Sequence, residues 1–111
     1  MSWRGRRINI LKENIKCSFI IPGYKCDKYI FRNIDSILDQ DYKNYEIIPI
    51  LNGQWESKEG LCQKLRNQYG DKIKLISIDK AGLANANNLG IIESDGDIIS
   101  HLSSDLYLMP R

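Results

Sequence analysis

The feature that most constrains the fold of this chain is a regular alternation between short apolar runs and longer amphipathic segments. The first three runs are residues 17–21, 46–51 and 74–78, and a fourth follows a turn at residues 95–97. Runs that are apolar on both faces and separated by helical segments are typical of parallel strands covered on both sides. The order therefore predicts β-α-β-α-β-α-β, an α/β domain with helices on both faces and right-handed crossovers.

Capping residues and apolar spacing locate the helices between these runs. We expect Asp27 to cap the first helix and Ser57 to cap the second, which ends at Gly70. A third, weaker helix is expected over residues 83–93. The apolar positions of the first two helices are Ile30, Ile34, Ile37, Leu38, Leu61, Leu65 and Tyr69.

Pro49 is the residue that fits this pattern least, because it lies inside the second apolar run. A proline cannot donate a hydrogen bond to a neighbouring strand. Two explanations stay open. Either the strand has a bulge or an edge position there, or one ladder bond is lost at a cost of about 1 kcal/mol.

The composition is that of a single folded domain. The chain has 111 residues, of which 42% are hydrophobic, and this is enough to bury a core. No apolar run reaches the roughly 18 residues that a membrane-spanning helix needs. The N-terminus also lacks the apolar region of a secretory signal, so we expect a cytoplasmic protein.

The cysteines and the single histidine argue against a zinc site. Cys17, Cys26 and Cys62 form no Cys-x-x-Cys pair, and free thiols in a reducing cytoplasm are the simplest interpretation. His101 is the only histidine, too few for the common zinc-ligand sets. We expect His101 to be packed in the core of the fourth strand rather than to bind a ligand.

Charge is distributed unevenly along the chain, although the net charge is only +2. Residues 1–16 carry five basic side chains and one acidic side chain. We interpret residues 1–15 as a solvated basic extension. An alternative is a weak contact with an anionic membrane surface, which makes a membrane-peripheral location the second hypothesis. Nucleic-acid binding is not expected, because the basic residues do not recur along one folded face.

The loops that follow the four strands carry side chains suited to a nucleotide. Tyr24 offers an aromatic face to a base, and Asn52 can both donate and accept, which matches a pyrimidine edge. Gly82 opens a helix whose free N–H groups attract phosphate, and Asp105 can hold a divalent cation beside a diphosphate. Each of these residues also has a purely structural interpretation. In the same order, these are a side chain that covers a loop, a turn, a helix start and a solvated acid. Together, at one sheet edge, they favour nucleotide binding.

Four segments, in this order, resemble family 2 glycosyltransferases of the GT-A fold. Residues 18–25, SFIIPGYK, resemble S-[VI]-I-I-P-[TV]-Y-N, and residues 36–48, SILDQDYKNYEII, are similar to S-[IL]-L-x-Q-T-Y-x-N-x-E-I-I. Residues 82–91, GLANANNLGI, resemble G-x-[AS]-x-A-R-N-x-G, and residues 96–110 resemble G-[DE]-[YI]-I-x-F-L-D-x-D-D-x-x-x-P. The resemblance covers residues 16–111. It implies the Rossmann-like N-terminal half of a GT-A fold, with strand order 3-2-1-4.

The resemblance also implies a function, which is transfer of a sugar from a nucleotide-diphosphate donor to an acceptor hydroxyl. The implied donor is a UDP- or dTDP-sugar, and the implied cofactor is Mn²⁺ or Mg²⁺. By this resemblance Pro22 and Tyr24 pack on the base, Asn52 reads the uracil edge, and Asp105 binds the metal. The other implied donor-site residues are Gly53, Gly82, Asn87 and Ser104.

Three positions depart from the family pattern. Ser103 stands where the first acid of the Asp-x-Asp motif belongs, and Leu51 stands where the family often has an acid. Asn87 stands where an arginine often meets the diphosphate. These departures keep open an alternative of a different class, a non-catalytic nucleotide- or partner-binding module on the same fold. A further alternative is an unrelated doubly wound domain with another strand order.

Length is the largest departure from the family. Family members are normally much longer than 111 residues, and their second half carries the acceptor site and the catalytic base. We therefore expect residues 16–111 to be the donor-binding part without the acceptor half, inactive on its own. An exposed edge at the fourth strand is expected to favour a homo-oligomer.

Overall fold

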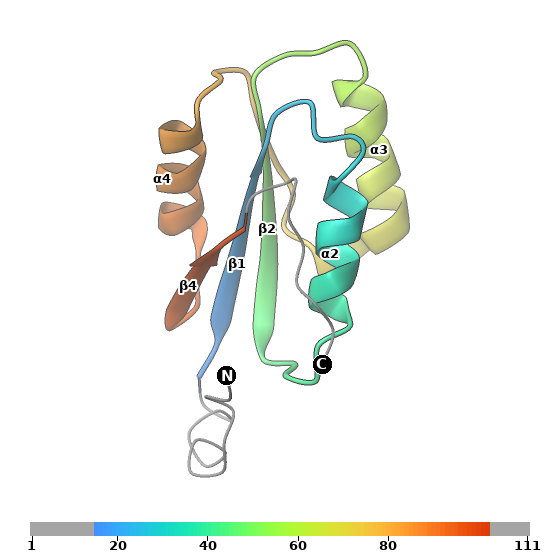
Figure 1. Cartoon of the computed structure of the whole chain (residues 1–111). Coiled ribbons are helices and arrows are strands. Elements are labelled where there is room, and N and C mark those ends of the chain that lie inside the picture. The colour runs from blue at the N-terminus through green and yellow to red at the C-terminus, as the bar shows by residue number, and fades with distance from the viewer. Residues whose placement is uncertain (1–14, 103–111) are drawn as a thin grey trace.

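The computed structural model describes residues 15–102, which form one parallel sheet with helices on both faces (Figure 1). The sheet order is β3-β2-β1-β4, and all three pairings are parallel. The elements are β1 (Cys17–Gly23), α2 (Ile30–Leu38), β2 (Tyr45–Asn52), α3 (Lys58–Tyr69), the 3-10 turn η2 (Gly70–Lys72), β3 (Ile76–Ile78), α4 (Leu83–Glu93) and β4 (Ile98–His101).

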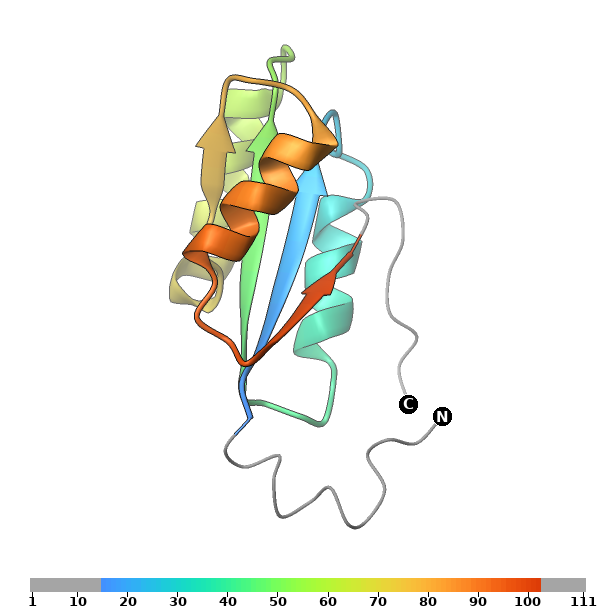
Figure 2. The same cartoon turned by 90° about the vertical axis from the view of Figure 1, so that its left-hand side faces the viewer.

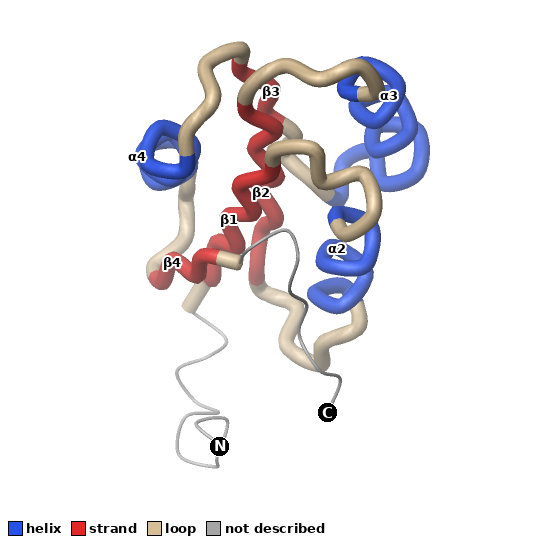
Figure 3. The backbone as a smooth tube through the Cα atoms, turned by 45° about the horizontal axis from the view of Figure 1, so that its top comes forward, coloured by secondary structure: helices blue, strands red, loops and turns tan. Residues whose placement is uncertain are grey.

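The helices divide between the two faces of the sheet. Seen along the sheet, α4 lies on one side, while α2 and α3 lie together on the other (Figure 3). This arrangement confirms the predicted α/β class, the helices on both faces and the strand order 3-2-1-4. The order gives no support to an unrelated domain with a different topology.

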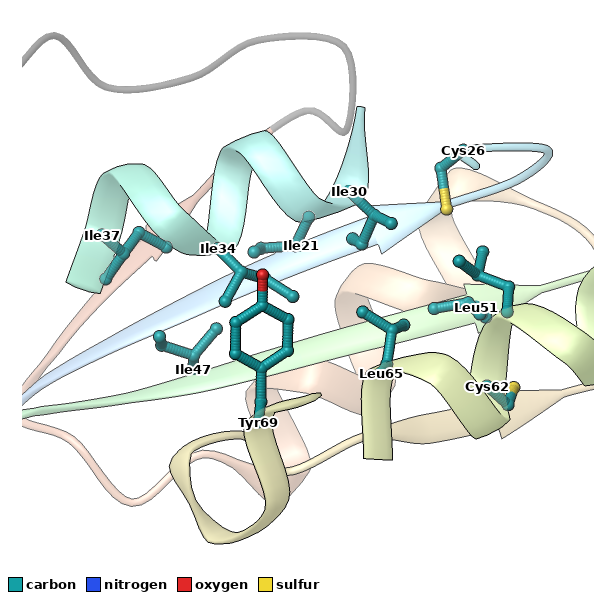
Figure 4. Close-up of a cluster of buried hydrophobic side chains, with 11 residues drawn as sticks. Ile21, Cys26, Ile30, Ile34, Ile37, Ile47, Leu51, Cys62, Leu65 and Tyr69 are labelled. Atoms are coloured by element: carbon teal, nitrogen blue, oxygen red, sulfur yellow. The ribbon is translucent and has the colours of Figure 1, made fainter. Parts of the chain in front are cut away.

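The larger core fills the space between the sheet and the α2–α3 face (Figure 4). Aliphatic side chains of β1 and β2 meet one face of each helix there, and Tyr69 closes the cluster. The Tyr69 hydroxyl donates a hydrogen bond to Asp35 Oδ1 at 2.7 Å. Burial and this bond to Asp35 both raise the pKa of Tyr69 above its ordinary value. All of the predicted apolar helix positions are buried except Leu38, which is half-buried.

The smaller core lies under α4 and depends on a close approach of the helix backbone. Ile20 and Ile50 of the sheet pack against Ala86 and the backbone at Gly90. A Cβ atom added at Gly90 would lie 2.9 Å from Ile20 Cδ1 and 3.0 Å from Ile50 Cδ1. Glycine at this position therefore sets how closely α4 packs on the sheet.

Pro49 lies in the interior of β2, and neither an edge position nor a bulge is needed to explain it. Its register with β1 is continuous, and Pro49 pairs with Ile21. The carbonyl of Ile47 accepts a hydrogen bond from the Lys74 N–H at 2.8 Å, so alternate residues of β2 from Ile47 onward direct their backbone groups toward the β3 side. The ladder with β3 begins only at Ile50. The missing N–H of Pro49 thus faces the β3 side between the Ile47–Lys74 bond and the first ladder pair at Ile50, so one hydrogen bond is absent there.

The predicted start of the first helix at Asp27 is wrong. The helix α2 begins at Ile30, its N-cap residue is Tyr29, and no side chain caps it. The Asp27 carboxylate instead accepts hydrogen bonds from Trp55 Nε1 at 2.9 Å and from Ser57 Oγ at 2.6 Å. Ser57 is the N-cap residue of α3, as predicted, but its hydroxyl serves Asp27. A long-range contact has replaced two local caps.

Three residues of the motif segments meet at the amino edge of the sheet. Ser18 Oγ donates to Glu46 Oε2 at 2.6 Å and accepts from the Gly96 N–H at 2.8 Å. A Cβ atom at Gly96 would lie 2.8 Å from the carbonyl oxygen of Lys16. Lys16 Nζ also lies 3.5 Å from Asp95 Oδ2. This network joins β1, β2 and the turn before β4, so these motif residues have a structural role.

Candidate functional site

The carboxyl edge of the sheet contains the point where the chain changes direction of winding. The strands β1 and β4 are neighbours, yet α2 follows β1 on one face and α4 precedes β4 on the other. Figure 2 shows α4 crossing in front of the sheet, with β4 beside β1. Ligands of open α/β sheets bind beyond the carboxyl ends of strands at such a switch point.

Asn52 is the central polar residue of this edge, and only 4% of it is exposed. Its Oδ1 accepts a hydrogen bond from the Gly82 N–H at 3.0 Å, and its Nδ2 donates to the carbonyl of Gly23 at 3.1 Å. The amide therefore joins the ends of β1 and β2 to the start of α4. One amide hydrogen and one oxygen lone pair stay available for another partner.

An aromatic surface lies beside Asn52. The Tyr24 side chain is 49% exposed and packs against Gly53, where an added Cβ would lie 2.8 Å from a ring carbon. Gly53 also has φ 87°, a conformation that favours glycine. The Trp55 ring meets Tyr24 edge-on, with centroids 5.5 Å apart. Pro22, expected beside the base, is buried within β1. Tyr24 is thus held in place while much of its surface stays open.

Lys25 has an unusual backbone at this edge. Its φ is 53°, and it is the only non-glycine residue with positive φ in residues 15–102. Its Nζ lies 5.3 Å from the centroid of the Tyr24 ring. The left-handed conformation costs an L-residue with a Cβ about 1–2 kcal/mol. The loop after β1 therefore holds an exposed lysine in a strained conformation.

Lys58 is a residue of this edge that the sequence did not reveal. It is 5% exposed, and its Nζ donates to the carbonyls of Gly53 at 2.6 Å and of Ile78 at 2.8 Å. Lys58 is also the first residue of α3, where the helix dipole disfavours a positive charge. No described carboxylate forms an ion pair with it. A lysine just after a turn is ordinarily solvated, so only the folded contacts reveal that it connects the ends of β2 and β3.

The start of α4 is close to the end of β4. Gly82 is the N-cap residue of α4, as predicted, and its φ is 138°. Asn87 follows one turn later, and its Oδ1 lies 3.1 Å from His101 Nδ1. His101 is exposed, so the prediction that it is packed in the core is wrong. The reason is that α4 packs over β1 and β2, so that among residues 15–102 no helix covers most of β4.

The predicted metal ligand lies beyond the end of β4 in the sequence. Ser103, Ser104 and Asp105 are outside the described residues, as are residues 1–14 of the basic extension. Within residues 15–102 no group of three or more His, Cys, Asp or Glu side chains is placed to hold a metal ion. No helix in that range is long and apolar enough to cross a membrane.

The cysteines take no part in the site. All three are free thiols, and Cys26 and Cys62 are buried in the larger core. Burial, and after it the negative charge of Asp27, raise the pKa of the Cys26 thiol to about 12. A thiol with so high a pKa is a poor nucleophile near neutral pH.

Comparison with known proteins identifies relatives along most of the chain. The model of the family described as glycosyl transferase family 2 matches residues 18–111. Glycosyltransferase GlyA of Streptococcus pneumoniae is 30% identical over 93 residues, which are 84% of this chain and 13% of GlyA. Across eight of the curated relatives that it matches, the chain spans 13% to 31% of their length.

Solved structures share the fold. S. aureus TarS 1-349 in complex with UDP superposes with a TM-score of 0.70 at 23% identity, covering 84% of this chain and 28% of TarS 1-349. Mannosyltransferase PcManGT from Pyrobaculum calidifontis, in complex with GDP-Man and Mn²⁺, has a TM-score of 0.72 at 20% identity. That match covers 82% of this chain and 28% of PcManGT.

Proposed function

The chain belongs to glycosyltransferase family 2, and we propose that the carboxyl edge of its sheet binds the nucleotide-diphosphate-sugar donor of a sugar transfer. The observation that carries this proposal is the buried amide of Asn52, which holds the loops of Tyr24, Gly53 and Gly82 together at the switch point. In the whole protein this edge serves transfer of the sugar from a UDP- or dTDP-linked donor to an acceptor hydroxyl.

Each part of the edge has chemistry that suits a part of the donor. The exposed ring of Tyr24 offers a stacking surface to a base. The free hydrogen and lone pair of the Asn52 amide match a pyrimidine edge. The first N–H groups of α4, after Gly82, suit a phosphate because they are unpaired and lie at the positive end of the helix dipole. A TarS structure that contains UDP supports the choice of a uridine nucleotide.

The proposed metal ligand is Asp105, with the Ser104 hydroxyl as a neighbouring oxygen. A carboxylate and a hydroxyl are the hard oxygen donors that Mg²⁺ and Mn²⁺ prefer, so the residue types fit either ion. Bound there, the ion neutralises charge on the leaving diphosphate. The structure of PcManGT in complex with GDP-Man and Mn²⁺ supports the choice of a divalent ion.

Calorimetric titration of the 111-residue chain with UDP, with and without Mn²⁺, tests the proposal. We expect millimolar or tighter binding that Mn²⁺ strengthens. Asp105→Ala should remove the Mn²⁺ effect and leave the affinity measured without metal unchanged. Asp71→Ala is the matched control, because Asp71 is an exposed acid in η2, after the C-terminal end of α3. Absence of UDP binding would favour the alternative of a partner-binding module.

A further inference from the structure

Lys25 carries a conformational cost that the fold itself does not explain. Its backbone is left-handed, with φ 53°, although glycine adopts that region freely. The side chain is exposed and belongs to neither hydrophobic core, so core packing does not offset the cost. Its ammonium forms no ion pair with a described residue. Strained residues of this kind cluster at active sites and ligand-binding positions.

The strained backbone brings a cation to the mouth of the proposed donor site. Lys25 is the second residue after the end of β1, at the switch point between β1 and β4. Its Nζ lies 5.3 Å from the centroid of the Tyr24 ring, and that ring is fixed by Gly53 and Trp55. An exposed cation–π contact is weak, so a phosphate can displace the ring as the partner of the ammonium.

Other lysines of this edge are placed less well for an anionic ligand. Lys58 is buried, and its ammonium already donates to the carbonyls of Gly53 and Ile78. Lys80 follows β3, which lies at the far side of the sheet from the switch point. Lys25 combines exposure, a fixed neighbour and a central position.

We infer that Lys25 binds the phosphate groups of the nucleotide that occupies this edge, and that its left-handed backbone directs the ammonium toward them. The inference rests on the proposed function and adds to it a residue that recognises the anionic part of the donor. An ammonium group offers three donors on a flexible stem and binds phosphate as a point charge.

Two substitutions separate charge from strain. Lys25→Met removes the charge and keeps a side chain of similar length in the same backbone conformation. Lys25→Gly removes the charge and also the cost of the left-handed backbone. Lys28→Met is the matched control, because Lys28 is an exposed lysine three residues further along the same loop. Each variant of the full chain is titrated with UDP and with uridine, which lacks phosphate, and is unfolded in urea.

We expect both Lys25 variants to bind UDP about five- to tenfold more weakly, the loss of one charged phosphate contact. Their affinity for uridine should stay within about twofold, as should both affinities of the control. Lys25→Gly should also unfold at a higher urea concentration than Lys25→Met. If the strained backbone serves binding, Lys25→Gly should be more stable than Lys25→Met and should still bind UDP more weakly than the parent chain does.

Each contrary result has its own meaning. Unchanged UDP affinity in Lys25→Met would overturn this inference and leave the proposed function standing. Equal losses for UDP and uridine would also overturn it, because Lys25 would then act on the base rather than on phosphate. Equal urea midpoints for the two Lys25 variants would refute the role assigned to strain. Failure of the parent chain to bind UDP would overturn the proposed function and this inference together.

Discussion

Replacing Asn52 by alanine tests whether its buried amide organises the carboxyl edge. The substitution removes the hydrogen bond from the Gly82 N–H, of 3.0 Å, and the hydrogen bond to the Gly23 carbonyl, of 3.1 Å. Both backbone groups then face a small cavity instead of a partner. The side chain is only 4% exposed, so bulk water does not readily take its place.

The expected magnitude follows from these two bonds. Each contributes a net stability of about 1 kcal/mol, and a buried group left without a partner costs about 1–3 kcal/mol. Gly82 is only half-buried, which favours the lower part of that range for its N–H, whereas Gly23 is buried. We therefore expect Asn52→Ala to lower the free energy of unfolding by about 2–4 kcal/mol.

Urea unfolding followed by circular dichroism measures this change. Asn88→Ala is a matched control, because Asn88 is an exposed asparagine in α4 and alanine is the better helix former. The control should unfold at the same urea concentration as the parent or a slightly higher one. If Asn52→Ala proved as stable as Asn88→Ala, the amide would not hold the three loops together, and the proposed donor site would lose its structural basis.

Three further predictions concern the two cores and the outer strand. Gly90→Ala should lower the free energy of unfolding by about 1–3 kcal/mol, because the new methyl group meets Ile20 and Ile50; the same substitution at exposed Gly60, where nothing lies within 4 Å, should not. The pKa of the Cys26 thiol is raised from 9.0 to about 12, which means that the folded state favours the protonated thiol. The contribution of this thiol to the free energy of unfolding is therefore complete below pH 9.0 and is lost as the pH rises toward 12. The free energy of unfolding of the parent chain should fall by about 1 kcal/mol between about pH 8 and pH 10, and that of Cys26→Ala should fall by less. An equal fall in the two proteins would refute the assignment of this pH dependence to Cys26. β4 ends the sheet within residues 15–102 and exposes 36% of Ile99, so sedimentation velocity should show self-association that Ile99→Lys weakens; a monomer at every concentration would contradict this.

The residues of the site that the sequence predicted are those whose positions follow from the geometry of a parallel sheet. Tyr24 follows β1, Asn52 ends β2 and Gly82 precedes α4, and a parallel sheet brings such positions to one edge. The sequence could not show that the Asn52 amide binds the loops of Gly23 and Gly82, since that depends on atoms from three separate segments. Nor could it show that Lys58 is buried or that Lys25 is left-handed, because both depend on the path of the surrounding loops.

The sequence by itself determined the order and nature of the elements, because periodic burial is a local property. The helix over residues 83–93 is an example, and it occurs with those bounds. Interactions between distant segments were decided only by the tertiary structure. Asp27 could have capped a helix, yet its carboxylate pairs with Trp55 and Ser57. His101 lies in an apolar run and is nevertheless exposed, because burial of a strand depends on which helices cover it. A residue's local preference is worth about 1 kcal/mol, and its tertiary partners can outweigh that preference.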